Sequence, residues 1–185
     1  MTCILMILFM VSYAQEEVKL TPKEQRKAEK AKLKKEKEEK ENANWQIYKK
    51  MAQEREFVIE FERVTSIATG NAYVITKRLN FLSASHDSVI IQIETPQYFS
   101  MNGLGGITIS GNMSNYKYKP PKNDKKPIFI NFNVTHKSNP RPINISITVT
   151  KDGVASITFG TVSSIYGTFL PASEADINIG VDMWK

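Results

Sequence analysis

Hydrophobic and polar residues alternate along most of the chain after residue 57, as in strands with one buried and one solvated face. The clearest case runs from Ile143 to Thr150, where isoleucine and valine alternate with Asn, Ser and Thr. Gly, Pro or Asn interrupts the pattern about every ten to twelve residues, so residues 57–185 are expected to form an all-β domain of about eight or nine strands. The expected strands contain Phe57–Phe61, Val89–Ile93, Ile107–Ile109, Tyr116–Tyr118, Ile128–Val134, Ile143–Thr150, Val154–Phe159, Ile165–Leu170 and Ile177–Met183.

Strands that are apolar on one face must bury those faces against each other or close into a ring. The sequence therefore predicts an antiparallel β-sandwich or a small β-barrel, and it does not choose between them. One hairpin can be placed more closely. Asp152 and Gly153 separate two alternating runs, and this pair is favoured in two-residue turns because both positions need positive φ.

A long charged helix is expected before the β domain. Thr21 supplies a capping hydroxyl, Pro22 suits the first helical position, and Glu24 follows three residues after the cap. From Lys23 to Glu41 only two alanines and one leucine are apolar, so no face is wide enough to pack on a core. Residues 15–56 are therefore predicted to be a charged helical spacer.

The end of this helix carries an apolar stripe, which we interpret as an amphipathic end that packs on the β domain. An alternative is that the stripe or the charged half contacts a partner helix or an anionic surface. The stripe consists of Trp45, Ile47, Tyr48, Met51 and Ala52.

The N-terminus resembles a secretion signal. Ile4–Val11 is an uninterrupted apolar run, followed by small residues at Ser12 and Ala14. The run is far shorter than the ~20 residues that span a bilayer. We therefore expect residues 1–14 to be a signal peptide, the protein to be periplasmic or secreted, and no integral membrane span to remain after cleavage. Because no basic residue precedes the run, a buried or membrane-anchoring N-terminal helix is the alternative.

Charge and cysteine content argue against two classes of function, nucleic-acid binding and thiol chemistry. The net charge of +6 is divided about equally between residues 15–56 and 57–185, so neither part is a concentrated basic patch and nucleic-acid binding is not expected. The only cysteine, Cys3, lies inside the leader, so the mature chain has no disulfide and no reactive thiol.

Candidate chemistry is sparse. His86 and His136 are the only histidines, and an enzyme would need both to meet a carboxylate in one cleft. No metal-ligand spacing is recognisable, so we expect neither a cofactor nor a metal. The glycine-rich segment Asn102, Gly103, Leu104, Gly105 and Gly106 leads into a strand and could form a ligand loop.

Uncharged Asn, Ser and Thr faces beside tyrosine side chains suggest a second kind of site, because they could hydrogen-bond and stack on a sugar. Simple solvated sheet faces have the same composition. The tyrosines concerned are Tyr73, Tyr98, Tyr116 and Tyr118.

The chain resembles a family of short exported Bacteroidetes proteins classed as domain of unknown function 4251. The most specific stretch is residues 102–111, Asn-Gly-Leu-Gly-Gly-Ile-Thr-Ile-Ser-Gly, followed by Ser114-Asn115-Tyr116-Lys117. The resemblance implies an export signal, an N-terminal helix and a β domain, and it brings no activity, cofactor or catalytic residue. Secreted proteins of that group can be O-glycosylated at Asp-Ser/Thr before an aliphatic residue, so Ser88 in Asp87-Ser88-Val89 is a candidate acceptor.

The leading hypothesis is a non-enzymatic protein of the cell envelope whose β domain is structural or binds an envelope protein. The alternative is a periplasmic binding module for a hydrophobic or glycan ligand, which a pocket of about 300 Å³ or more would favour and a packed core would oppose.

Overall fold

The computed structural model describes residues 21–66, 70, 72–94, 106–136, 139–159 and 163–181. The predicted signal peptide, residues 1–14, lies outside these ranges. The chain divides into two compact units, Met1–Lys37 and Glu38–Lys185. Their boundary falls within the single helix α1 (Pro22–Glu54).

The start of α1 is a reciprocal capping box, which confirms the helix start predicted at Thr21. The Thr21 backbone N–H and hydroxyl both donate to Glu24 Oε2, at 2.9 and 2.7 Å, and the Glu24 N–H donates back to the Thr21 hydroxyl at 3.4 Å. These hydrogen bonds lower the pKa of the Glu24 carboxyl. Residues 23–37 are exposed throughout, as their composition predicted.

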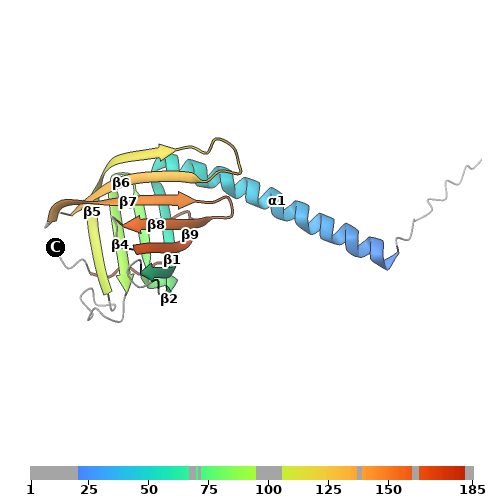
Figure 1. The fold of residues 1–185 in the computed structure, drawn as a ribbon, viewed down its shortest axis with the longest axis horizontal. Coiled ribbons are helices and arrows are strands. Elements are labelled where there is room, and N and C mark those ends of the chain that lie inside the picture. The colour runs from blue at the N-terminus through green and yellow to red at the C-terminus, as the bar shows by residue number, and fades with distance from the viewer. Residues whose placement is uncertain are drawn as a thin grey trace, which may run out of the picture. The chain divides into compact units, whose positions relative to one another are not determined.

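The β domain is a closed antiparallel barrel of eight strands, which decides between the two architectures that the sequence left open. The barrel order is β1, β3, β4, β5, β6, β7, β8, β9, and β9 pairs back with β1 (Figure 1). The short β2 adds to the edge of β1 beyond β3. The strands are β1 (Glu56–Ser66), β2 (Ala72–Val74), β3 (Phe81–Ser85), β4 (Ser88–Glu94), β5 (Gly106–Lys119), β6 (Ile128–His136), β7 (Asn139–Val149), β8 (Val154–Phe159) and β9 (Ser163–Leu170).

Three sequence predictions of strands and turns need correction. β2 and β3 were not expected, and the two segments expected around Ile107 and Tyr116 are one long strand, β5. The β7–β8 connection, residues 150–153, is longer than the two-residue turn that was expected: Gly153 N–H donates to Thr150 O, and Thr150 N–H donates to Val154 O. Gly153 is left-handed at φ 84°, whereas Asp152 is not among the residues with positive φ.

The third correction concerns the C-terminal segment. The strand expected over Ile177–Met183 is absent from residues 177–181, and residues 182–185 lie outside the described ranges. Because β1 and β9 pair with each other, the closed barrel offers no free edge there for a further strand. Residues 171–181 instead follow β9 and hydrogen-bond to groups of β1 and β4.

The barrel core contains the end of α1. Trp45, Met51 and Ala52 are buried in the same cluster as the inward side chains of the strands, so most of the predicted stripe packs on the β domain. The prediction was wrong for Ile47, which is 45% exposed. Figure 1 shows these last turns of α1 beside one end of the barrel, where β1 begins.

A buried polar cluster ties the C-terminal segment to the barrel. Gln92 on β4 is fully buried, and its side-chain amide donates to Leu79 O at 3.1 Å and Asn178 O at 2.8 Å. Its side-chain oxygen accepts from Gly180 N–H at 2.7 Å and from the Thr108 hydroxyl at 2.8 Å. One side chain thus forms hydrogen bonds with four partners, three of them buried or half-buried.

Replacing Gln92 with Ala is expected to lower the free energy of unfolding by about 1–3 kcal/mol, because these partners lose their hydrogen bonds in a region with little water. Urea denaturation measures the effect. Gln53→Ala, at an exposed helical position, is the matched control and should change stability by less than about 0.5 kcal/mol. Equal stability of the two variants would contradict a structural role for the cluster.

Candidate functional site

The predicted ligand loop falls largely outside the described part of the chain. The residues outside the described ranges are Asn102, Gly103, Leu104 and Gly105. Gly106 is the first residue of β5 and pairs with Glu94. The candidate acceptor Ser88 is the first residue of β4 and is exposed. O-glycosylation at Ser88 stays a prediction.

The two histidines lie on different elements and differ in burial. His86 lies in the β3–β4 turn beside the end of α1, where its N–H donates to Arg55 O at 3.0 Å. His136 is the last residue of β6 and is buried. Among the described residues, no group of three His, Cys, Asp or Glu side chains could hold a metal ion.

The outer wall formed by β6, β7, β8 and β9 carries the polar face predicted from alternation. Two rows of outward side chains cross these strands and continue onto the end of β5. The first row is Lys117, Asn131, Ser146, Thr158 and Ser164, and the second is Lys119, Phe129, Thr148, Ser156 and Tyr166. At about 4.8 Å between neighbouring strands, each row extends over roughly 19 Å.

Hydrogen bonds between strands order part of this wall. The Ser146 hydroxyl donates to Asn131 Oδ1 at 2.6 Å. The Asn144 amide donates to Asn133 Oδ1 at 3.0 Å. These amides and hydroxyls are therefore held in place before any partner arrives, which reduces the entropy lost on binding.

Two aromatic side chains lie within the polar face, but they are not the tyrosines expected from the sequence. Phe129 is 41% exposed, and the half-buried Tyr166 ring lies under the Arg63 guanidinium, 4.7 Å from the ring centroid. Tyr116 and Tyr118 instead pack against the core, so the prediction was wrong for both. The side chains of Tyr73 and Tyr98 lie outside the described part.

Strands β5–β9 of this wall carry no negative charge. The five strands β5–β9 contain no Asp or Glu within their bounds. Lys117 and Lys119 at one side and Arg63 at the other are exposed, and none of the three forms an ion pair within the described residues. The wall is therefore neutral along its middle and basic at the side of β5, whereas at the other side Arg63 shares β1 with Glu60 and Glu62.

Glu62 lies at the β1 bulge beside this wall. Its Oε1 accepts from Lys77 Nζ at 2.8 Å and from the Thr168 hydroxyl. These two hydrogen bonds, first that of Lys77 and then that of Thr168, hold the pKa of the Glu62 carboxyl below its ordinary value of 4.5.

A lowered pKa in the folded state gives stability that is present above the unfolded pKa and is lost as the pH falls through the folded value. We therefore expect the wild type to lose more stability than Glu62→Gln between about pH 7 and about pH 3. The difference should stay below about 1 kcal/mol, because Glu62 is 44% exposed. Urea midpoints at both pH values measure it. Lys77→Gln should show a similarly reduced pH dependence, and equal acid sensitivity of Glu62→Gln and wild type would contradict the pairing.

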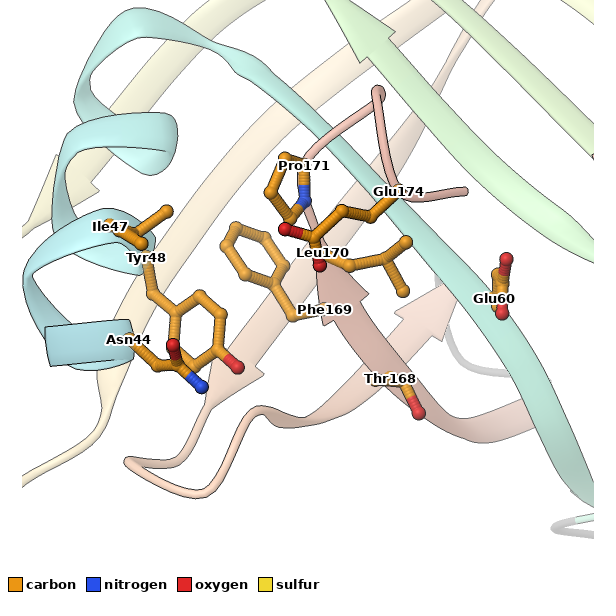
Figure 2. Close-up of a pocket in the computed structure, with 9 residues that line it drawn as sticks. All are labelled: Asn44, Ile47, Tyr48, Glu60, Thr168, Phe169, Leu170, Pro171 and Glu174. Carbon is orange, nitrogen blue, oxygen red and sulfur yellow. The ribbon is translucent and has the colours of Figure 1, made fainter. Parts of the chain in front are cut away.

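A pocket of about 250 Å³ lies where α1, β1 and the end of β9 meet. Figure 2 shows Glu174 above Leu170 and Phe169, with Tyr48 on one side and Glu60 on the other. Tyr48 contacts the Phe169 ring edge-on at 5.7 Å, and burial, followed by the charges of Glu174 and Asp152, raises the pKa of its hydroxyl. The volume of this pocket is below the range of about 300–1,000 Å³ usual for ligand pockets. The pocket therefore suits only a small amine or polyhydroxyl group.

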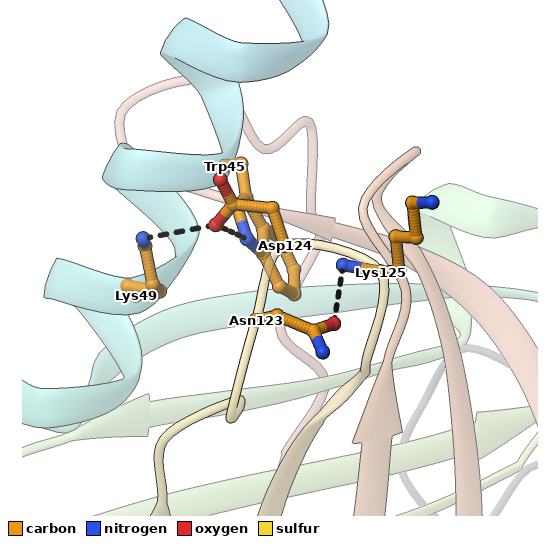
Figure 3. Close-up of polar contacts among 5 residues, drawn as sticks. All are labelled: Trp45, Lys49, Asn123, Asp124 and Lys125. Atoms are coloured by element: carbon orange, nitrogen blue, oxygen red, sulfur yellow. Dashed lines mark hydrogen bonds and ion pairs between the residues drawn. The ribbon is translucent and has the colours of Figure 1, made fainter.

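On another side of α1, a hydrogen bond and an ion pair join the β5–β6 connection to the helix (Figure 3). Trp45 Nε1 donates to Asp124 Oδ1 at 3.1 Å, and Lys49 Nζ lies 3.6 Å from the same oxygen. Asn123 Oδ1 accepts from the Lys125 N–H at 3.1 Å, which shapes the turn that carries Asp124. This arrangement is structural, since it fixes the indole that fills the end of the core.

Comparison with known proteins gives a family and a fold. The model of a family described as a domain of unknown function, DUF4251, matches residues 23–164. The barrel is similar to the crystal structure, at 1.95 Å resolution, of a DUF4251 family protein from Bacteroides eggerthii, with a TM-score of 0.55 and 22% identity over 70% of this chain and 91% of that one. No curated protein matches the chain.

Proposed function

The chain belongs to the DUF4251 family, and we propose that it is an exported, non-enzymatic protein of the bacterial cell envelope whose barrel is an interaction domain. The observation that carries this proposal is the contrast between the two sides of the barrel wall. Large apolar side chains fill the interior, whereas the outer wall of β6–β9 presents ordered amides and hydroxyls around exposed aromatic carbon.

The filled interior argues against the hydrophobic-ligand alternative. Phe57, Phe61 and Phe132 have almost no exposed surface and lie in one cluster with isoleucines from β6, β7 and β8. A barrel that carries a ligand inside leaves space between its inward side chains. The outer wall is therefore the better candidate surface for a partner.

Export is supported by the apolar run Ile4–Val11 before Ser12 and Ala14, and by the envelope character of the family resemblance. No described helix has both the length and the apolar character needed to cross a membrane. The non-enzymatic part of the proposal is supported by the different settings of the two histidines: His86 is exposed in a turn, and His136 is buried at the end of β6.

Cell fractionation with N-terminal sequencing tests the export. We expect the chain in the periplasmic or extracellular fraction with Gln15 as its first residue. A full-length chain in the cytosol would contradict the proposal. Chemical cross-linking in intact cells then tests the interaction: cross-links from Lys117 and Lys119 to an envelope component are expected, and cross-links confined to the lysines of α1 would argue that the helix is the contact surface.

A further inference from the structure

We propose that the outer wall of β5–β9 binds an acidic polysaccharide. This inference rests on the proposed role of the barrel as an interaction domain and names the chemical class of its partner. The wall is defined by the two rows across these strands, and the argument depends on its hydrogen-bonding groups, its aromatic carbon and its charge.

The hydrogen-bonding groups suit a sugar. Side-chain amides and hydroxyls both donate and accept, as sugar hydroxyls do, and ionised carboxylates only accept. The pairs Ser146 with Asn131 and Asn144 with Asn133 are already joined, so each amide keeps a fixed orientation towards solvent. A protein partner would more often be met by a large apolar centre, whereas the exposed large apolar side chains of this wall are Phe129 and Val154, on different strands.

The aromatic rings provide the second element. Phe129 lies in the same row as Thr148, Ser156 and Tyr166, so one ring stands at each side of a strip of hydroxyls. The C–H face of a pyranose packs on such rings while its hydroxyls reach the neighbouring side chains. Because each row crosses five strands, a polymer that follows it gains contacts that a single sugar would not.

Charge selects the class of polymer. Strands β5–β9 supply no carboxylate, and Lys117 and Lys119 are exposed at one side of the rows. At the other side Arg63 is exposed on β1, and the neighbouring Glu62 carboxylate is paired with Lys77. An arginine can bind a carboxylate through two hydrogen bonds, and lysine adds a point charge. Repeating uronic acids would therefore meet cations at both ends of the strip and neutral hydroxyls between them.

The experiment measures binding of the purified full chain to polygalacturonate, with neutral dextran as the comparison polymer, by isothermal titration calorimetry. Phe129→Ala should weaken binding about tenfold, because truncation of an aromatic anchor removes much of an interface's affinity. Lys117→Gln with Lys119→Gln should weaken it by a similar factor and flatten its salt dependence. Circular dichroism establishes that the variants are folded, as expected for exposed side chains.

Matched controls separate a site from general attraction of a polyanion to a basic protein. Ile47→Ala removes an apolar side chain that is 45% exposed, close to the 41% of Phe129, and should leave binding unchanged. Lys27→Gln with Lys30→Gln removes the same charge from exposed positions of α1 and should also leave it unchanged. Equal loss in the two double-lysine variants, equal affinity for dextran, or no binding of either polymer would overturn the proposal. Cell fractionation tests export separately. A chain that binds polygalacturonate but is found in the cytosol would contradict the proposed export and leave the proposed binding intact.

Discussion

Truncation of Trp45 to alanine is expected to lower the free energy of unfolding by about 3–5 kcal/mol. The indole has no exposed surface and belongs to the same core cluster as the inward residues of the strands. Its removal leaves a cavity between α1 and the end of the barrel. Loss of the hydrogen bond to Asp124 adds little, because that carboxylate is 59% exposed and can bind water.

Urea denaturation of the full chain measures this effect, and two further variants make it specific. Trp45→Phe should lose less than Trp45→Ala, because most of the ring packing is retained. Ile47→Ala, two residues along the same helix, should change stability by less than about 0.5 kcal/mol. A loss below about 1 kcal/mol for Trp45→Ala would mean that the helix does not contribute to the core.

Gly167→Ala is expected to lower the free energy of unfolding by more than about 3 kcal/mol. Gly167 lies on β9 opposite Phe61, where β1 bends at its bulge. An added Cβ would lie 2.1 Å from the carbonyl oxygen of Glu60, which is backbone and cannot rotate away. The two strands that close the barrel would have to separate.

The control for Gly167→Ala is Ser164→Ala on the same strand. Ser164 faces outward and is half-buried, so its substitution should change stability by less than about 0.5 kcal/mol. Hydrogen exchange of the backbone amides gives a second measurement. In Gly167→Ala we expect the amides of β1 and β9 to exchange faster than those of the other strands of the barrel. Wild-type stability and protection in Gly167→Ala would contradict the close approach of β1 and β9.

Local patterns predicted much of the fold. The cap at Thr21 and seven of the strands follow from residue types and from alternation. β3 was missed because it is short and begins with two buried residues: Leu82 points into the barrel, and Phe81 on the other face is also fully buried. Alternation is left only over residues 82–85. Closure could not be predicted, because it depends on the pairing of β1 with β9 across about a hundred residues of sequence and on one bulge.

The candidate surface was partly predictable for the same reason. Alternation placed Phe129 on the polar side of its strand, beside Asn131 and Asn133. Tyr166 was hidden in the apolar run from Ile165 to Leu170, where outward and inward residues do not differ in polarity. That Arg63 lies over Tyr166 depends on the β1–β9 register, which only the closed structure gives.

The most direct test of the central claim, that the outer wall of β5–β9 is the interaction surface, is a nuclear magnetic resonance titration of the ¹⁵N-labelled chain with short polygalacturonate fragments. We predict that amide shifts concentrate at Phe129, Asn131, Ser146, Thr158 and Tyr166. Shifts concentrated around Tyr48 and Glu174, or spread along the lysines of α1, would contradict it.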